Sequence, residues 1–86
     1  FKALDKLSKL VSFKRAFIFG SIASDTFYPS SDVDIAFEGL ESDKLFFVVA
    51  FLSEELRRDV DVVELEKLPE FFKQKILKEG IEWKPN

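Results

Sequence analysis

The six residues from Asp32 to Phe37 alternate between polar or small side chains and large apolar ones, and this alternation constrains the fold most strongly. Successive side chains of a β-strand point to opposite faces, so Val33, Ile35 and Phe37 share one face. Asp32 and Asp34 then share the other face, roughly 6–7 Å apart along the strand. The pattern therefore predicts a strand that carries two carboxylates on one face.

The other segments alternate between helical and extended patterns. Helices are predicted over 1–12, 42–58 and about 69–80, and strands over 16–20, 60–65 and optionally 81–83. Ser42 is the expected N-cap of the middle helix. The order α-β-(turn)-β-α-β-α predicts an α/β (α+β) fold, with helices packed on one face of a small sheet.

The length and composition bound the chemistry. Eighty-six residues predict one domain, 1–86, and a hydrophobic fraction of 47% with eleven Phe is enough for a packed core. The chain has no Cys and no His. This excludes disulfides, thiolate metal sites and catalysis by Cys or His, so any catalysis depends on carboxylates, hydroxyls, Lys, Arg or a bound metal.

The charge and the hydropathy pattern argue against two further classes of protein, those that bind nucleic acid directly and those that span a membrane. A net charge of −3 and a pI near 4.9 argue against direct nucleic-acid binding, which needs a dense basic surface. The longest apolar run, Leu45 to Leu52, is too short to span a membrane. The start of the chain is not typical of a signal peptide, because Asp5 and several Lys interrupt it, and we expect a cytoplasmic protein.

Two motifs suggest a phosphate and metal site. Gly20-Ser21 ends a predicted strand, where backbone N–H groups and a hydroxyl can hold phosphate, although such a pair is usually only a turn. Asp32 and Asp34 repel each other unless a cation lies between them, and Mg²⁺ prefers carboxylate oxygens. The alternative for the two acids is a solvated face that keeps the protein soluble.

A third acid interrupts an apolar run later in the chain. Asp61 lies within Val60-Asp61-Val62-Val63, where an acid costs stability unless it is exposed or paired. If this strand neighbours the one with Asp34, Asp61 completes a cluster of three carboxylates; otherwise it occupies an outward position. Asp59 competes for the role, but it lies beside Arg57 and Arg58 and ranks lower.

These motifs together resemble the signature of the minimal nucleotidyltransferases (MNT) of the DNA polymerase β superfamily. The matching features are Gly20-Ser21, then ten residues, then Asp32-Val33-Asp34, with Asp61 in the position of the third acid. The resemblance implies a nucleotidyltransferase fold with a small mixed sheet. It also implies that Gly20 and Ser21 bind the nucleotide, and that Asp32, Asp34 and Asp61 bind metal and are catalytic.

The resemblance further implies an Mg²⁺-dependent enzyme that transfers AMP from ATP to a hydroxyl of a partner protein. Minimal members resemble the antitoxin half of HEPN/MNT toxin–antitoxin pairs, so the expected acceptor is a tyrosine of a HEPN ribonuclease toxin. One departure is the run Ile22-Ala23-Ser24-Asp25, where many members have an Arg-rich stretch. The alternative is a non-catalytic antitoxin that neutralises its partner by complex formation. A third hypothesis is a generic ferredoxin-like sandwich whose acids are only solubilising.

The helix predicted over 42–58 carries more apolar residues than a helix with a single buried face needs. Phe46, Phe47, Ala50 and Phe51 lie off the stripe that is expected to face the sheet. Two interpretations stay open: these residues form a partner or homo-oligomer surface, or they pack inside the domain.

Overall fold

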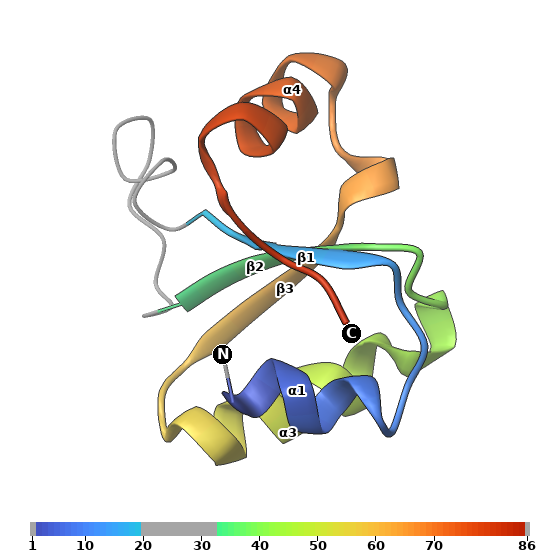
Figure 1. Cartoon of the computed structure of the whole chain (residues 1–86), viewed down its shortest axis with the longest axis vertical. Helices are drawn as coiled ribbons and strands as arrows, with labels where there is room; N and C mark the ends of the chain where they lie inside the picture. The colour runs from blue at the N-terminus through green and yellow to red at the C-terminus, as the bar shows by residue number, and fades with distance from the viewer. Residues whose placement is uncertain (1, 20–32, 86) are drawn as a thin grey trace.

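The computed structural model describes residues 2–19 and 33–85 (Figure 1). In chain order the elements are α1 (Lys2–Ser8), β1 (Arg15–Ile18), β2 (Val33–Glu38), the 3-10 helix η1 (Ser42–Lys44), α3 (Leu45–Leu56), β3 (Val60–Glu64), the 3-10 helix η2 (Leu65–Lys67), α4 (Glu70–Glu79) and β4 (Ile81–Trp83). The predicted order is confirmed, including the short final strand. None of the helices in these two ranges is long and apolar enough to cross a bilayer.

The four strands form one mixed sheet in the order β3-β2-β1-β4. Strand β1 is antiparallel to both β2 and β4, whereas β2 and β3 are parallel. Parallel neighbours need a crossover connection, and α3 supplies it between β2 and β3. The predicted fold class is confirmed.

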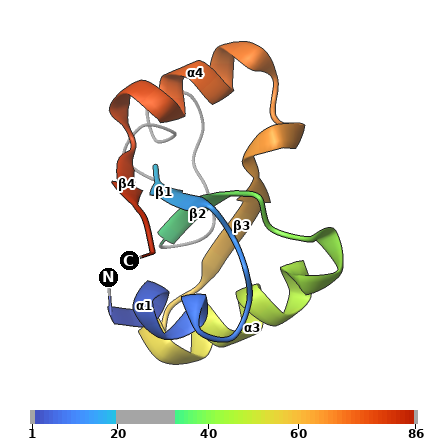
Figure 2. The same ribbon diagram turned by 45° about the vertical axis from the view of Figure 1, so that its right-hand side comes forward.

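Helices cover both faces of the sheet rather than one. Figures 1 and 2 show α1 and α3 on one side and α4 on the other. The expectation that the helices share one face therefore differs from the structure for α4. The physical reason lies in β1, where Ala16 and Phe17 point to opposite faces and are both buried. A strand that is apolar on both faces needs a layer on each side.

The core accordingly has two parts, one on each face. The larger part lies between the sheet and α1 and α3, and its buried residues are Ala3, Leu4, Leu7, Phe13, Ala16, Ile35, Phe37, Leu40, Val48, Leu52, Val60, Val62 and Trp83. The smaller part lies between the sheet and α4, and its buried residues are Phe17, Phe19, Ala36, Leu65 and Ile76. Phe72 and Leu77 on α4 pack against this second part.

The turn after β2 fixes the start of the crossover. Gly39 has a φ of +79°, and a Cβ atom there would lie 3.1 Å from the Lys14 side chain, so glycine suits this position. Ser42 begins η1 and does not cap α3 as predicted. Its hydroxyl instead donates a hydrogen bond to Oε1 of Glu64 at 2.8 Å, which ties the crossover to the end of β3.

Candidate active site

The two acids that the structure describes at the candidate site lie side by side on neighbouring strands. Asp34 on β2 and Asp61 on β3 are register partners in the parallel pair. Partners in adjacent strands are about 4.8 Å apart and their side chains share a face. The condition set by the sequence, that the strand of Asp61 neighbours that of Asp34, is therefore confirmed.

This shared face is the one covered by α4. Asp34 lies two residues before Ala36, which belongs to the core under α4, and Asp61 lies two residues before Val63, which packs against that core. Asp34 is 2% exposed, whereas Asp61 is exposed. The pair therefore extends from the interior to the surface, so that one carboxylate is sheltered and its neighbour is accessible to a substrate.

The chemistry of the donor set suits a hard divalent cation. Carboxylate oxygens are the ligands that Mg²⁺ takes from proteins, and Asp34 and Asp61 supply them from one sheet face. Within 2–19 and 33–85, no group of three acidic side chains could hold a metal ion. Gly20, Ser21 and Asp32, the other predicted site residues, lie outside the described residues, as do Ser24 and Asp25.

The described residues on either side of 20–32 lie next to Asp34 and to the start of β3. The amide of Phe19 donates to the carbonyl oxygen of Asp34 at 3.0 Å. Val33, adjacent to Asp34 in β2, donates its amide to the carbonyl oxygen of Asp59 at 3.2 Å. Asp59, the alternative candidate for the third acid, thus lies before β3 and contacts the site only through its backbone carbonyl. Asp61, in contrast, is the register partner of Asp34.

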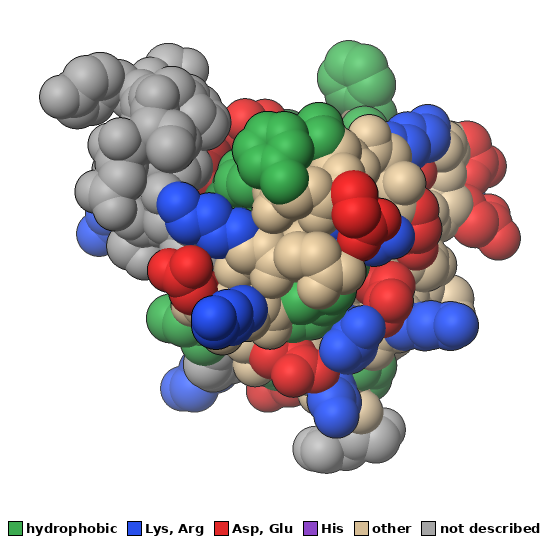
Figure 3. All heavy atoms as spheres, turned by 90° about the horizontal axis from the view of Figure 1, so that it is seen from above, with side chains coloured by type: hydrophobic (Ala, Val, Ile, Leu, Met, Phe, Trp, Pro, Cys, Tyr) green, Lys and Arg blue, Asp and Glu red, His purple; other side chains and the backbone are tan. Residues whose placement is uncertain are grey.

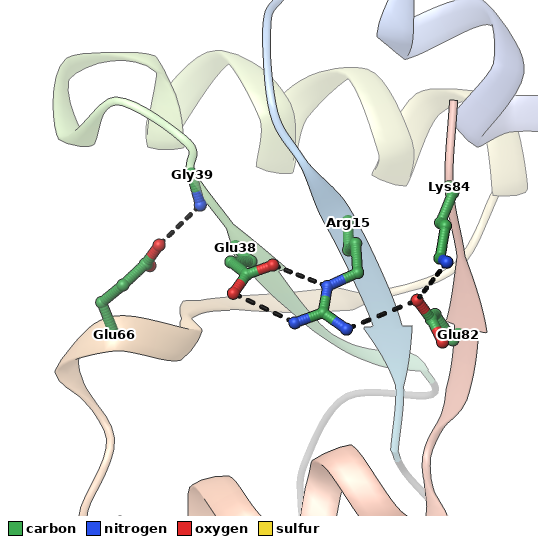
Figure 4. Close-up of polar contacts among 6 residues, drawn as sticks. All are labelled: Arg15, Glu38, Gly39, Glu66, Glu82 and Lys84. Carbon is green, nitrogen blue, oxygen red and sulfur yellow. Dashed lines mark hydrogen bonds and ion pairs between the residues drawn. The ribbon is translucent and has the colours of Figure 1, made fainter. Parts of the chain in front are cut away.

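A different charge arrangement occupies the far end of the same face. Arg15 on β1 forms a two-point ion pair with Glu38 on β2, with Nε–Oε1 at 2.6 Å and Nη2–Oε2 at 3.1 Å (Figure 4). Its Nη1 lies 3.5 Å from Oε2 of Glu82 on β4, and Lys84 lies 3.6 Å from that oxygen. The Arg15 guanidinium also lies 5.1 Å from the ring centroid of Phe17.

This ion pair shifts the pKa of both partners. The hydrogen bond from Arg15 is the main reason that the pKa of Glu38 is lowered, and the nearby positive charge adds to the effect while burial opposes it. The hydrogen bond to Glu38 likewise raises the pKa of Arg15 above its ordinary value. Sequence reasoning missed this network. The sequence contains only a weak signal for it, because the antiparallel register of β1 and β2, which places Arg15 opposite Glu38, has to be known first.

Charges are mixed over the α4 side of the molecule. Viewed from that side, acidic and basic side chains are interspersed, with hydrophobic side chains between them (Figure 3). The described part of this face thus presents no continuous basic band.

Comparison with known proteins gives two findings and one absence. The family model described as Polymerase beta, Nucleotidyltransferase matches residues 2–83. A search among curated proteins found no match.

Solved structures with the same fold come from toxin–antitoxin pairs. One is a chain of a toxin–antitoxin with AMP-PNP, with a TM-score of 0.71 and 24% identity over 99% of this chain and 73% of that one. Another is from an MntA-HpeT mutant in which a tyrosine is replaced by alanine, with a TM-score of 0.72 and 23% identity over 99% of this chain and 72% of that one. A third, in which two aspartates are replaced by glutamate, has a TM-score of 0.72 and 21% identity over 99% and 73%. At this identity the likeness establishes the fold.

Proposed function

The chain belongs to the polymerase β nucleotidyltransferase family, and from this premise we propose that it transfers AMP from ATP to a hydroxyl of a partner protein. The observation that supports this reaction is the register pair of Asp34 and Asp61, which offers two carboxylates to one ligand. In the proposal Gly20 and Ser21 contact the triphosphate, and Asp32 joins the two described acids.

The carboxylates would hold Mg²⁺. Their oxygens fit a hard divalent cation, which when bound neutralises the triphosphate and orients it for in-line attack. The buried Asp34 lies on β2, one of the two central strands of the sheet, and we assign it to metal binding with Asp32. Metal binding also offsets the repulsion between neighbouring carboxylates.

Asp61 takes a second role in this proposal. In the transfer, the acceptor oxygen forms a bond to the α-phosphorus, the bond to the β-phosphate oxygen breaks, and pyrophosphate leaves. The acceptor hydroxyl must lose its proton in the same reaction. Asp61 is exposed beside Asp34 and accepts this proton as a general base, while also binding metal.

The partner in this proposal is a toxin, and the chain acts as an MNT antitoxin in the cytoplasm. Structures of similar fold come from toxin–antitoxin pairs, and one of them is with AMP-PNP, an ATP analogue. The replaced aspartates in another are two positions apart, like Asp32 and Asp34. These features support a toxin as partner, and the proposal takes the HEPN type and the tyrosine acceptor from the family resemblance. Self-association through helix 42–58 stays a separate prediction.

The test uses ATP labelled at the α-phosphate, Mg²⁺ and the protein encoded beside this chain. We expect label on the partner with the native chain and none with Asp34→Asn. Glu38→Gln is the matched control, because Glu38 lies on the same strand and the same face and undergoes the same carboxylate-to-amide change. Absence of label with a folded and bound partner would exclude the transfer.

A non-catalytic antitoxin is the second candidate, and the exposed aromatic residues of α3 favour it. It predicts that a double variant, Asp32→Asn with Asp34→Asn, still protects cells from the toxin. Loss of protection at unchanged affinity for the toxin would exclude this candidate.

A further inference from the structure

Exposed phenylalanines lie on two helices of the described chain, and one of these helices covers the acid pair. On α3, Phe46 is 90% exposed and Phe47 is 45% exposed, so the interpretation that these two residues pack inside is wrong. On α4, Phe71 is 78% exposed. Helix α4 covers the sheet face that carries Asp34 and Asp61, whereas α3 lies on the other side of the sheet (Figure 2). The side chains of α4 are therefore the ones to consider for contact with a substrate at the acids.

Two contacts hold α4 at the end of β1 that adjoins the acid pair. The ring of Phe72 meets the ring of Phe19 edge-on, with the two centroids 5.6 Å apart. Just after the last turn of α4, a Cβ atom on Gly80 would lie 3.5 Å from the carbonyl oxygen of Ile18. Phe19 also donates its amide to the carbonyl oxygen of Asp34. Helix α4 therefore crosses the sheet at the end of β1, where Phe19 adjoins Asp34.

The two flanks of α4 face opposite ends of this sheet face. Ile76 is fully buried, so its side of the helix faces the sheet. The positive charge of Lys73 stabilises the ionised Glu38 carboxylate, so Lys73 lies on the flank toward that far end. Residues two positions apart on an α-helix are rotated by about 200° from each other, so Lys75 lies on the opposite flank. Lys75 thus faces the end of the sheet that carries Asp34.

An aromatic ring and a cation lie together on this acid-side flank. Phe71 and Lys75 share it, because residues four positions apart lie one above the other on a helix. Lys75 is partly buried, and among the described side chains it has no ion-pair partner within 4.0 Å. The ring of Phe71 lies 6.4 Å from that of Phe72, and most of its surface is open. Both groups are therefore available to a ligand bound beside the acids.

The two groups match the two halves of a nucleoside triphosphate. A lysine ammonium binds phosphate oxygens as a point charge, and an exposed aromatic ring stacks on a nucleobase. The carboxylates of Asp34 and Asp61 repel the same phosphates, so a cation on the neighbouring helix offsets part of that repulsion. We propose that this flank of α4 recognises the nucleotide, with Lys75 on its phosphates and Phe71 stacked on its base. The inference rests on the proposed function and names residues that recognise its substrate.

The test measures binding by isothermal titration calorimetry, with the whole chain, Mg²⁺ and no partner protein. One titrant is ATP, and the other is inorganic tripolyphosphate, which has no base. Lys75→Gln should raise the dissociation constants of both titrants at least about fivefold, because a charged hydrogen-bond donor is lost. Phe71→Ala should raise the dissociation constant of ATP at least about fivefold and leave that of tripolyphosphate within about twofold, because only the base stacks on the ring.

Each variant has a matched control. Lys73→Gln removes the same charge from the opposite flank of α4, and Phe46→Ala removes an exposed ring from α3. Both controls should bind ATP within about twofold of the native chain, as expected of surface changes away from the site. Lys75→Arg keeps the charge and Phe71→Trp keeps a ring, so both should retain binding of ATP. Circular dichroism checks the fold, and Lys75→Met replaces Lys75→Gln if that variant does not fold.

The outcomes separate this inference from the proposed function. If the native chain binds ATP and neither Lys75→Gln nor Phe71→Ala weakens binding, the α4 assignment is wrong and the proposed function stands. If Phe71→Ala binds ATP like the native chain but loses binding to the toxin, the ring serves the partner and its assignment to the base is wrong. If the native chain binds neither titrant, the α4 assignment and the proposed function both fail.

Discussion

Asp34 and Glu38 lie on the same strand and the same face, four residues apart, yet their surroundings differ in charge. Glu38 is opposite Arg15, which meets both of its carboxylate oxygens. Asp34 has another carboxylate, Asp61, at its register position on β3. Like charges at register positions destabilise a sheet, whereas opposite charges stabilise it. The Arg15–Glu38 end of this face therefore contributes to stability through an ion pair, whereas the other end places two carboxylates at register positions, which is the arrangement that the proposed metal binding uses.

The comparison also shows why burial alone does not identify the site. Asp34 is almost completely buried and Glu38 is partly buried. A carboxylate that is both buried and next to a second carboxylate needs a compensating ligand or hydrogen bonds, and such positions concentrate at functional sites. A carboxylate with a guanidinium partner is already compensated and needs no ligand.

The largest expected effect comes from Asp34→Asn. The amide has almost the same shape but no charge, so the proposed Mg²⁺ would lose a charged ligand, and label transfer from ATP should fall by at least about 10²-fold. Glu38→Gln, the same change at the other end, should leave transfer within about twofold of the native rate. Equal losses in the two variants would remove the distinction between the ends.

Asp61→Asn should lower transfer and stabilise the fold at the same time. Loss of a general base costs about 10²–10⁴-fold in rate. Removal of a like charge from the Asp34 register pair should raise the free energy of unfolding by a few tenths of a kcal/mol. Asp59→Asn is the matched control, since Asp59 joins the site through its carbonyl oxygen, and its transfer rate should not change. Urea unfolding and label transfer measure the two effects, and a destabilised Asp61→Asn would contradict the repulsion.

The pairing of the acids was within reach of the sequence because it depends on periodicity and chain order. Alternation placed Asp34 on the strand face opposite Val33, Ile35 and Phe37, and a parallel crossover through 42–58 brings the next strand beside it. The residues missed were those whose position depends on register. Arg15 meets Glu38 only because the antiparallel pairing of β1 and β2 aligns them.

The side of the sheet that α4 covers was misjudged for a similar reason. A run such as Ala16 to Phe19 is apolar on both faces, and this was a usable signal for a second layer. Ser42 is a different case. Its hydroxyl had the right residue type for a cap, but Glu64 lies within reach only in the folded chain and takes the hydrogen bond instead. Neither local propensity nor spacing contains that tertiary contact.

Removal of the ion pair by Arg15→Ala should lower the free energy of unfolding by about 1 kcal/mol, since the pair is two-point and only partly exposed. For a domain of this size that corresponds to a melting temperature about 4–8 °C lower. The matched control is Glu82→Gln, whose oxygen is 3.5 Å from Arg15 and should contribute less. A larger loss for Glu82→Gln than for Glu38→Gln would show that Arg15 acts mainly through β4.

The pH dependence of the free energy of unfolding should show the contribution of the ion pair at Glu38. The pKa of Glu38 is lower in the folded chain than its ordinary value of 4.5, because Arg15 donates hydrogen bonds to the ionised form. A lowered pKa contributes stability that is fully present above the ordinary value and is lost as the pH falls through the lowered one. The difference in unfolding free energy between the native chain and Glu38→Gln should therefore be constant from about pH 6 to 8 and shrink below about pH 4.5. A difference that grows on acidification would contradict the assignment.

The smallest effect is expected at the end of β3, where Glu64 lies in the far half of the sheet with Glu38. Hydrogen bonds from Ser42 and then from Lys67 lower the pKa of Glu64. Ser42→Ala removes the first of these, so the pKa should rise toward 4.5 while remaining below it, since Lys67 still lies 3.1 Å away. An NMR titration of the Glu64 carboxyl carbon measures this rise, and Ser53→Ala on α3 is the matched control. If Ser42→Ala leaves the titration unchanged, Lys67 alone holds the charge of Glu64. The far end of the sheet would then depend on ion pairs throughout, which sharpens its contrast with the paired acids at Asp34.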